Sequence, residues 1–160
     1  MSAEARYWAQ HPALGLLADA GGGGARTASG LRLTRTHGTC MWPGLREGDL
    51  VFYADVPDGP LADLVGRIAI ARAHGEPVAH RILRVLGEPG AERLVLGGDL
   101  SEPDRLRPRR DILGIARAVY RPGHGFVDLP ERLVVGPLGR AILGRMARFF
   151  TWAERRARGG

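Results

Sequence analysis

The middle of the chain alternates apolar and polar residues in a way that predicts β-strands. Residues 31–36 read Leu-Arg-Leu-Thr-Arg-Thr, which is the period of a strand with one buried face. Short runs rich in leucine, β-branched and aromatic residues follow, separated by turns of glycine, proline and aspartate. Further strands are predicted at residues 50–54, 66–72, 77–86, 92–97 and 111–121, with a hairpin turn at 74–76. The predicted fold is therefore mainly β, a coiled antiparallel β-sheet whose last strand is 111–121.

The two ends of the chain follow other patterns. Residues 3–18 predict a short N-terminal helical segment that Pro12 interrupts, and the four glycines at 21–24 predict a flexible linker. From Gly139 the apolar residues recur at helical spacing and predict an amphipathic helix of about 18 residues. We divide the chain into an N-terminal segment with linker (1–30), a β domain (31–129) and a basic C-terminal helix (130–160).

The C-terminal helix allows two interpretations, because its apolar residues are interleaved with arginines. The first is ordinary packing on the sheet. The second is peripheral contact with an anionic membrane, since basic residues beside phenylalanine and tryptophan suit a negatively charged headgroup layer. The residues concerned are Ile142, Leu143, Met146, Phe149, Phe150 and Trp152 with Arg140, Arg145, Arg148, Arg155 and Arg156.

The positive charge of the chain comes from arginine alone. The 160 residues include 23 of lysine or arginine and 17 of aspartate or glutamate, a formal net charge of +6, and lysine does not occur. A lysine general base is therefore excluded. The arginines are spread over strands, loops and the C-terminus instead of forming one cluster, which disfavours a nucleic-acid partner. The segment 107–110, Arg-Pro-Arg-Arg, is interpreted as a solvated basic turn.

The single cysteine, Cys40, limits the chemistry further. It permits no internal disulfide and no cysteine-based zinc site, and it suits a reducing, cytoplasmic compartment. The sequence shows neither an apolar stretch of about 18 residues nor the pattern of a signal peptide. We expect no metal, no cofactor and a cytoplasmic protein, with any membrane contact peripheral.

Three short stretches hold the residues best suited to chemistry. Residues 37–49 read His-Gly-Thr-Cys-Met-Trp-Pro-Gly-Leu-Arg-Glu-Gly-Asp, so that Cys40 lies in a bend bounded by glycine and proline. His80 follows on a predicted strand, and Asp99 and Asp104 follow the next strand. Acyl transfer requires a nucleophile, a base, a group that orients the base and a donor to the oxyanion. Cys40, His80, one of the aspartates and the Cys40 backbone N–H are the candidates.

These three stretches resemble the motifs of the signal peptidase I and LexA-like peptidase superfamily. The resemblance is carried by Gly38-Thr39-Cys40-Met41-Trp42-Pro43-Gly44-Leu45-Arg46-Glu47-Gly48-Asp49, by His80-Arg81, and by Gly98-Asp99 with Asp104. It covers roughly residues 31–121 and implies the fold of that superfamily. It also implies that Cys40 takes the place of the nucleophilic serine and that His80 is the base, as in archaeal and endoplasmic-reticulum signal peptidases.

The resemblance implies further roles near these residues. Asp104 would orient His80 and Asp99 would be structural, although both stay candidates for the third catalytic position. The substrate would be a peptide or protein segment bound in extended conformation along a strand edge. Met41, Trp42 and Pro43 would line the substrate groove.

The sequence thus predicts a small peptidase that hydrolyses a peptide bond through Cys40 and His80. An active pair requires the sulfur and an imidazole nitrogen to lie within about 4 Å of each other. The alternatives are a catalytically inactive peptide-binding module on the same fold, and a basic regulator associated with a membrane surface or nucleic acid. A separation of the two side chains by more than about 8 Å would exclude catalysis.

Overall fold

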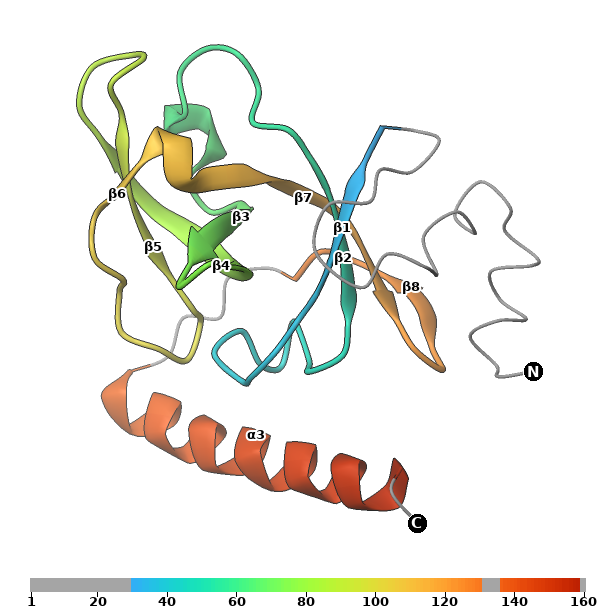
Figure 1. Ribbon diagram of the computed structural model, residues 1–160. Coiled ribbons are helices and arrows are strands. Elements are labelled where there is room, and N and C mark those ends of the chain that lie inside the picture. The colour runs from blue at the N-terminus through green and yellow to red at the C-terminus, as the bar shows by residue number, and fades with distance from the viewer. Residues whose placement is uncertain (1–29, 131–135, 159–160) are drawn as a thin grey trace.

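The computed structural model describes residues 30–130 and 136–158 (Figure 1). The expected N-terminal helical segment and the glycine linker lie outside these residues. The strands are β1 (Arg32–Arg35), β2 (Leu50–Ala54), β3 (Ile68–Ala73), β4 (Glu76–Leu86), β5 (Arg93–Gly97), β6 (Arg107–Pro108), β7 (Ile112–Arg121) and β8 (Gly125–Val127). Two short 3₁₀ turns, η1 (Ala62–Leu64) and η2 (Arg109–Asp111), lie between strands, and one long helix, α3 (Pro137–Arg158), follows them.

The strands form one antiparallel sheet that curls into a half-barrel (Figure 1). Its order is β1-β2-β7-β3-β4-β5-β6, and β8 pairs with the last part of β7. The prediction of a mainly β protein with a coiled antiparallel sheet and a C-terminal helix is confirmed. The prediction that 111–121 is the last strand was wrong, because a turn with left-handed glycines at 123 and 125 returns the chain as β8.

The curl of the sheet buries both faces of its central strands. In β2, Val51 and Tyr53 face one apolar cluster, while Leu50 and Phe52 face another, and none of the four is more than 4% exposed. This explains why β2 reads as a continuous apolar run instead of an alternating one. A third cluster lies between β3, β4, β5 and β7.

A two-residue turn joins β3 to β4, as expected. His74 and Gly75 both have positive φ, 52° and 87°, which is the backbone of a hairpin turn whose twist matches that of the strands. The register places His80 of β4 opposite Ala69 of β3. The pairing of β4 with β5 begins one residue later, at Arg81, and contains a bulge between Ile82 and Arg84.

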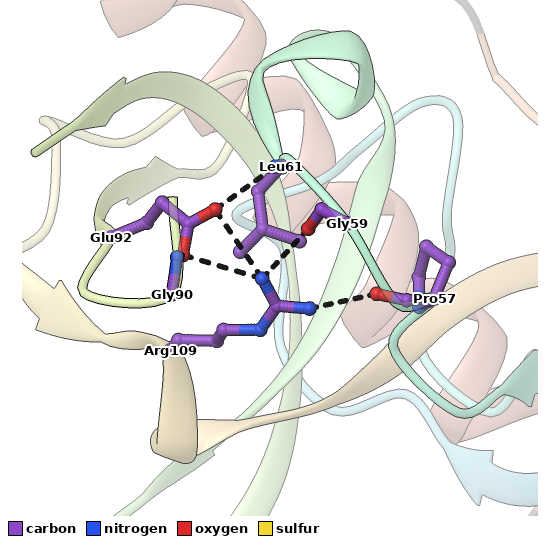
Figure 2. Close-up of polar contacts among 6 residues, drawn as sticks. All are labelled: Pro57, Gly59, Leu61, Gly90, Glu92 and Arg109. Carbon is purple, nitrogen blue, oxygen red and sulfur yellow. Dashed lines mark hydrogen bonds and ion pairs between the residues drawn. The ribbon is translucent and has the colours of Figure 1, made fainter. Parts of the chain in front are cut away.

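The segment 107–110 is not the solvated basic turn that the sequence suggested. Arg107 and Pro108 form β6, and the side chain of Arg109 extends to the loop before η1 (Figure 2). Its guanidinium donates to the carbonyl oxygens of Pro57 and Gly59 and pairs with Glu92 at 3.2 Å. Glu92 in turn accepts from the backbone N–H groups of Leu61 and Gly90. The Glu92 carboxylate is buried and therefore requires a positive partner, which Arg109 provides. This ion pair holds the turn against the domain.

The C-terminal helix is longer than expected, 22 residues beginning at Pro137. It lies across one end of the half-barrel, below the loop that contains Cys40 and the loop after β5 (Figure 1). Trp42 stacks on Phe150, Arg155 pairs with Glu47, and Arg140 pairs with Glu102. These contacts attach α3 to loops. Within the described residues, no helix is both long enough and apolar enough to cross a membrane.

Candidate active site

Cys40 lies in a tight bend between β1 and β2 whose flanks are anchored in the core. The Trp42 N–H donates to the Thr39 carbonyl at 3.1 Å, and the Leu45 N–H donates to the Met41 carbonyl at 2.9 Å. The side chains of Met41 and Leu45 are 4% and 2% exposed and belong to the cluster that also contains Val51. Two buried apolar residues that follow Cys40 in the bend therefore hold it at the surface of the core, where it is half-buried.

Asp49 provides a second anchor for this bend. Its buried carboxylate accepts from the Arg46 backbone N–H at 2.9 Å and from Arg121 at 2.8 and 3.0 Å. Arg121 also donates to the Gly44 carbonyl at 3.0 Å, so the end of β7 holds the loop at two points. The motif at 37–49 identified Asp49, but nothing local to Arg121 marked it as its partner.

A glycine allows the loop after β5 to approach the backbone of Cys40. The Leu100 N–H donates to the Cys40 carbonyl at 2.8 Å. A Cβ at Gly98 would lie 2.6 Å from that carbonyl oxygen and 2.7 Å from the Cys40 Cβ, well inside van der Waals contact. Gly98 is therefore a positioning residue for Cys40. The Gly98-Asp99 motif marks this residue in the sequence but does not reveal the steric reason for it.

Cys40, His80 and Asp104 form a continuous chain of polar contacts. The Cys40 Sγ lies 3.2 Å from His80 Nε2, which is inside the separation expected of an active pair. His80 Nδ1 lies 2.7 Å from Asp104 Oδ2. Asp104 is placed by pairing of its loop with the end of β5, where its N–H donates to the Leu96 carbonyl at 2.6 Å. Residues from three separate parts of the sequence thus meet at one point.

The contacts determine the tautomer of His80. The Asp104 carboxylate can only accept, so the proton of a neutral ring is on Nδ1 and Nε2 faces the sulfur with a lone pair. Nε2 can therefore take the thiol proton, after which it donates to the thiolate. Arg107, whose Nε lies 3.9 Å from Asp104 Oδ2, adds positive charge beside the carboxylate.

The surroundings favour the charged form of this ring. Burial is the largest influence and by itself would lower the pKa of His80. The hydrogen bond and charge interaction with Cys40, followed by those with Asp104, together outweigh it, so that the pKa of His80 lies above the ordinary value for histidine. An imidazolium between a sulfur and a carboxylate is thus stabilised from both sides.

Asp99, the competing aspartate, has a different partner. Its two carboxylate oxygens accept from Nε and Nη2 of Arg81, both at 2.8 Å, and the side chains of the pair are each 3% exposed. Arg81 also donates to the carbonyls of Gly66 and Pro130. His80 and Arg81 are neighbours on a strand and point to opposite faces. His80 therefore contacts Asp104, whereas Arg81 holds the Gly98–Asp99 loop.

A cavity of about 80 Å³ opens beside the sulfur. It lies between the segment from β1 to the cysteine bend and the first half of β4. Its lining includes Cys40, Met41, Leu45, Val78, Ala79 and His80, together with Thr34, Arg35, Thr36, His37, Gly38, Glu76 and Pro77. Met41, expected to line the substrate groove, lines this cavity as well as the core. Trp42 and Pro43 are not among its lining residues, and the Trp42 ring stacks on Phe150 of α3 instead.

The backbone N–H of Cys40 makes no hydrogen bond to any other residue in 30–130 or 136–158. It is therefore available as an oxyanion donor, the role that the sequence suggested for it. Across the same residues, no group of three or more His, Cys, Asp or Glu side chains is arranged to hold a metal ion.

Comparisons with protein-family models, with curated proteins and with solved structures find no match to this chain. The resemblance to the signal peptidase I and LexA-like superfamily therefore depends on the motifs quoted above.

Proposed function

We propose that this chain is a cysteine peptidase of the signal peptidase I and LexA-like type, with Cys40 as nucleophile, His80 as base and Asp104 as the group that orients His80. The observation that carries the proposal is the chain of contacts at 3.2 and 2.7 Å from sulfur through imidazole to carboxylate. A nucleophile within reach of a base, and a base held by a third group, is the arrangement that acyl transfer requires.

The proposed reaction has two halves. Nε2 of His80 takes the Cys40 proton, and the thiolate attacks the peptide carbonyl carbon, whose oxygen becomes an oxyanion beside the Cys40 N–H. The C–N bond breaks as His80 returns the proton to the amine, which leaves a thioester on Cys40. His80 then deprotonates a water molecule, whose oxygen attacks the thioester carbonyl carbon. The C–S bond breaks to release the carboxylic acid, and His80 returns the proton to the Cys40 thiolate. Asp104 favours the imidazolium at both stages.

The substrate is proposed to be an extended peptide segment. The cavity beside Cys40 lies between two stretches of strand, one around Thr34 and Thr36 and the other around Val78 and Ala79. Backbone groups of extended strands can bind a peptide main chain, and alternate side chains of that peptide then enter pockets. The apolar side chains of Met41, Leu45 and Val78 in the lining favour a small apolar side chain next to the cleaved bond.

The reactivity of Cys40 tests the proposed roles without knowledge of the substrate, because it is the only cysteine in the chain. We expect iodoacetamide to label the wild-type protein faster at pH 7 than it labels His80→Ala or Asp104→Asn. An ordinary thiol is only about 3% ionised at pH 7, so full stabilisation of the thiolate can accelerate labelling by up to roughly 30-fold. Equal rates in the three folded proteins would show that Cys40 is a bystander.

Peptide hydrolysis tests the function itself. Wild-type protein incubated with a library of proteome-derived peptides should generate new termini that Cys40→Ala does not generate. Cys40→Ser should keep the fold but lose much of the activity, because an imidazole that pairs with a thiolate need not deprotonate a hydroxyl. Rapid labelling of Cys40 without any cleavage would identify an inactive peptide-binding module.

A further inference from the structure

The apolar side chains of α3 form an exposed stripe on the side away from the domain. The stripe consists of Leu138, Ile142, Met146, Phe149 and Trp152, which are 75%, 50%, 42%, 61% and 54% exposed. Their spacing of three and four positions places them on one face of the helix. Ala147, two positions before Phe149 and so roughly opposite to it, is completely buried. The helix therefore packs through a small residue and leaves its large apolar side chains uncovered.

The charges on α3 show what could cover this stripe. The helix contains six arginines and one glutamate. Arg140 and Arg155 pair with Glu102 and Glu47 on the two loops that contact the helix, whereas Arg145 and Arg148 are exposed and make no ion pair within the described residues. Arg156 lies over the Trp152 ring at 5.5 Å. The exposed face thus combines aromatic rings with unpaired positive charge.

We propose that α3 binds the surface of an anionic lipid bilayer, with its axis in the membrane plane and the stripe inserted below the headgroups. Interfacial helices combine an exposed apolar face with basic residues, and their aromatic rings take the boundary between water and acyl chains. The bilayer offers phosphates at the depth that the arginine side chains reach. This proposal is independent of the chemistry of Cys40.

Charge also argues against a second copy of the chain as the occupant. A symmetric contact between two stripes would bring Arg145 and Arg148 of both copies together. Glu154, the one acidic residue of the helix, lies five positions after Phe149 and is not in the stripe. Such an interface would bury like charges without partners, which is unfavourable. An anionic surface supplies the missing counter-charges.

Binding to the bilayer would also bring the site close to it. Trp42 stacks on Phe150 at 6.2 Å between ring centroids, and Glu47 pairs with Arg155 at 2.6 Å, so the loop that contains Cys40 is attached to α3. Glu102, on the loop that contains Asp104, is attached to the start of the same helix. Both loops rest on the side of α3 opposite to the stripe.

Vesicle sedimentation with the full chain tests the proposal. We expect binding to phosphatidylcholine vesicles that contain phosphatidylserine and little binding to pure phosphatidylcholine vesicles. Phe149→Ser with Trp152→Ser should weaken binding roughly tenfold or more, because two inserted rings are lost. Val65→Ser with Leu86→Ser, which alters exposed apolar residues of the β domain, should have no effect.

The charge contribution has its own matched pair of variants. Arg145→Gln with Arg148→Gln should weaken binding roughly 25-fold, about fivefold for each arginine near the surface. Arg84→Gln with Arg93→Gln removes the same charge from exposed positions on β4 and β5 and should change binding little.

The proposal would be overturned if the protein bound neither kind of vesicle or bound both equally. It would also be overturned if a test variant and its control lost vesicle binding equally, or if the protein formed a dimer that only Phe149→Ser with Trp152→Ser abolished. The labelling rate of Cys40 in the same variants reports separately on the proposed active site.

Discussion

Substitution of Gly98 by alanine should displace Cys40 without altering any group of the proposed triad. The added Cβ would lie 2.6 to 2.7 Å from the carbonyl oxygen and Cβ of Cys40. Ordinary van der Waals contact begins near 3.4 Å, so the two loops must separate by about 0.7 to 0.8 Å. These neighbours are backbone or Cβ atoms, which cannot rotate away. Because Gly98 is not among the glycines with positive φ, the effect is steric.

A displacement of this size is large for a pair in which sulfur and nitrogen are 3.2 Å apart. Loss of the contact would leave the sulfur without the neighbouring base that is proposed to take its proton. We expect Gly98→Ala to slow labelling by iodoacetamide about tenfold, towards the rate of His80→Ala. A loss of peptide cleavage of up to about 10²-fold should accompany it.

The adjacent glycine is the matched control. A Cβ at Gly97 would meet Cδ1 of Leu83 at 2.7 Å, the end of a flexible and half-buried side chain, and would contact Pro103 at an ordinary 3.4 Å. Gly97→Ala should therefore keep the wild-type labelling rate. Circular dichroism establishes that both variants are folded. A folded Gly98→Ala protein that labels at the wild-type rate, or equal slowing in both variants, would refute the positioning role.

Other predictions concern stability. Because the pKa of His80 is raised in the folded protein, the stability that this shift provides is complete below about pH 6.5 and is lost as the pH rises through the folded-state pKa. Urea denaturation should thus show a larger wild-type advantage over His80→Gln near pH 5.5 than near pH 9, and a constant difference would contradict the linkage. Asp99→Asn should lower the free energy of unfolding by about 3–5 kcal/mol, because it leaves Arg81 buried without its anionic partner. The double variant Asp99→Leu with Arg81→Met removes both charges and should recover most of that loss. Ala147→Leu should cost about 1–3 kcal/mol in thermal denaturation by overpacking the contact of α3, whereas Ala141→Leu on its exposed side should be nearly neutral.

Much of the fold and of the candidate site could be predicted from local pattern. Alternation, short apolar runs and turn residues predicted the six longer strands and the hairpin, because side-chain period and turn chemistry depend on neighbouring residues. The two shortest strands, β6 and β8, were missed because each is defined by its partner. Cys40 and His80 were singled out as candidates because the stretches around them resemble motifs of the signal peptidase I and LexA-like superfamily, and because Cys40 is the single cysteine.

Tertiary structure alone decided which aspartate contacts the histidine. Asp99 and Asp104 lie on the same loop, and their positions in the sequence fit either role. The backbone hydrogen bond from Asp104 to Leu96 directs the Asp104 carboxylate to His80. The Asp99 carboxylate instead pairs with the buried guanidinium of Arg81. A buried guanidinium must have a counter-ion, and that requirement is visible only once distant strands are in register.

The same distinction holds for α3. Helical periodicity in the sequence predicted an amphipathic helix and named its apolar residues, and it left open whether these residues face the domain or the exterior. The contacts of the helix decided this, because a buried Ala147 and ion pairs with two loops place the opposite face outward. Periodicity defines the faces of a helix, but the direction in which each face points depends on residues far away in the chain.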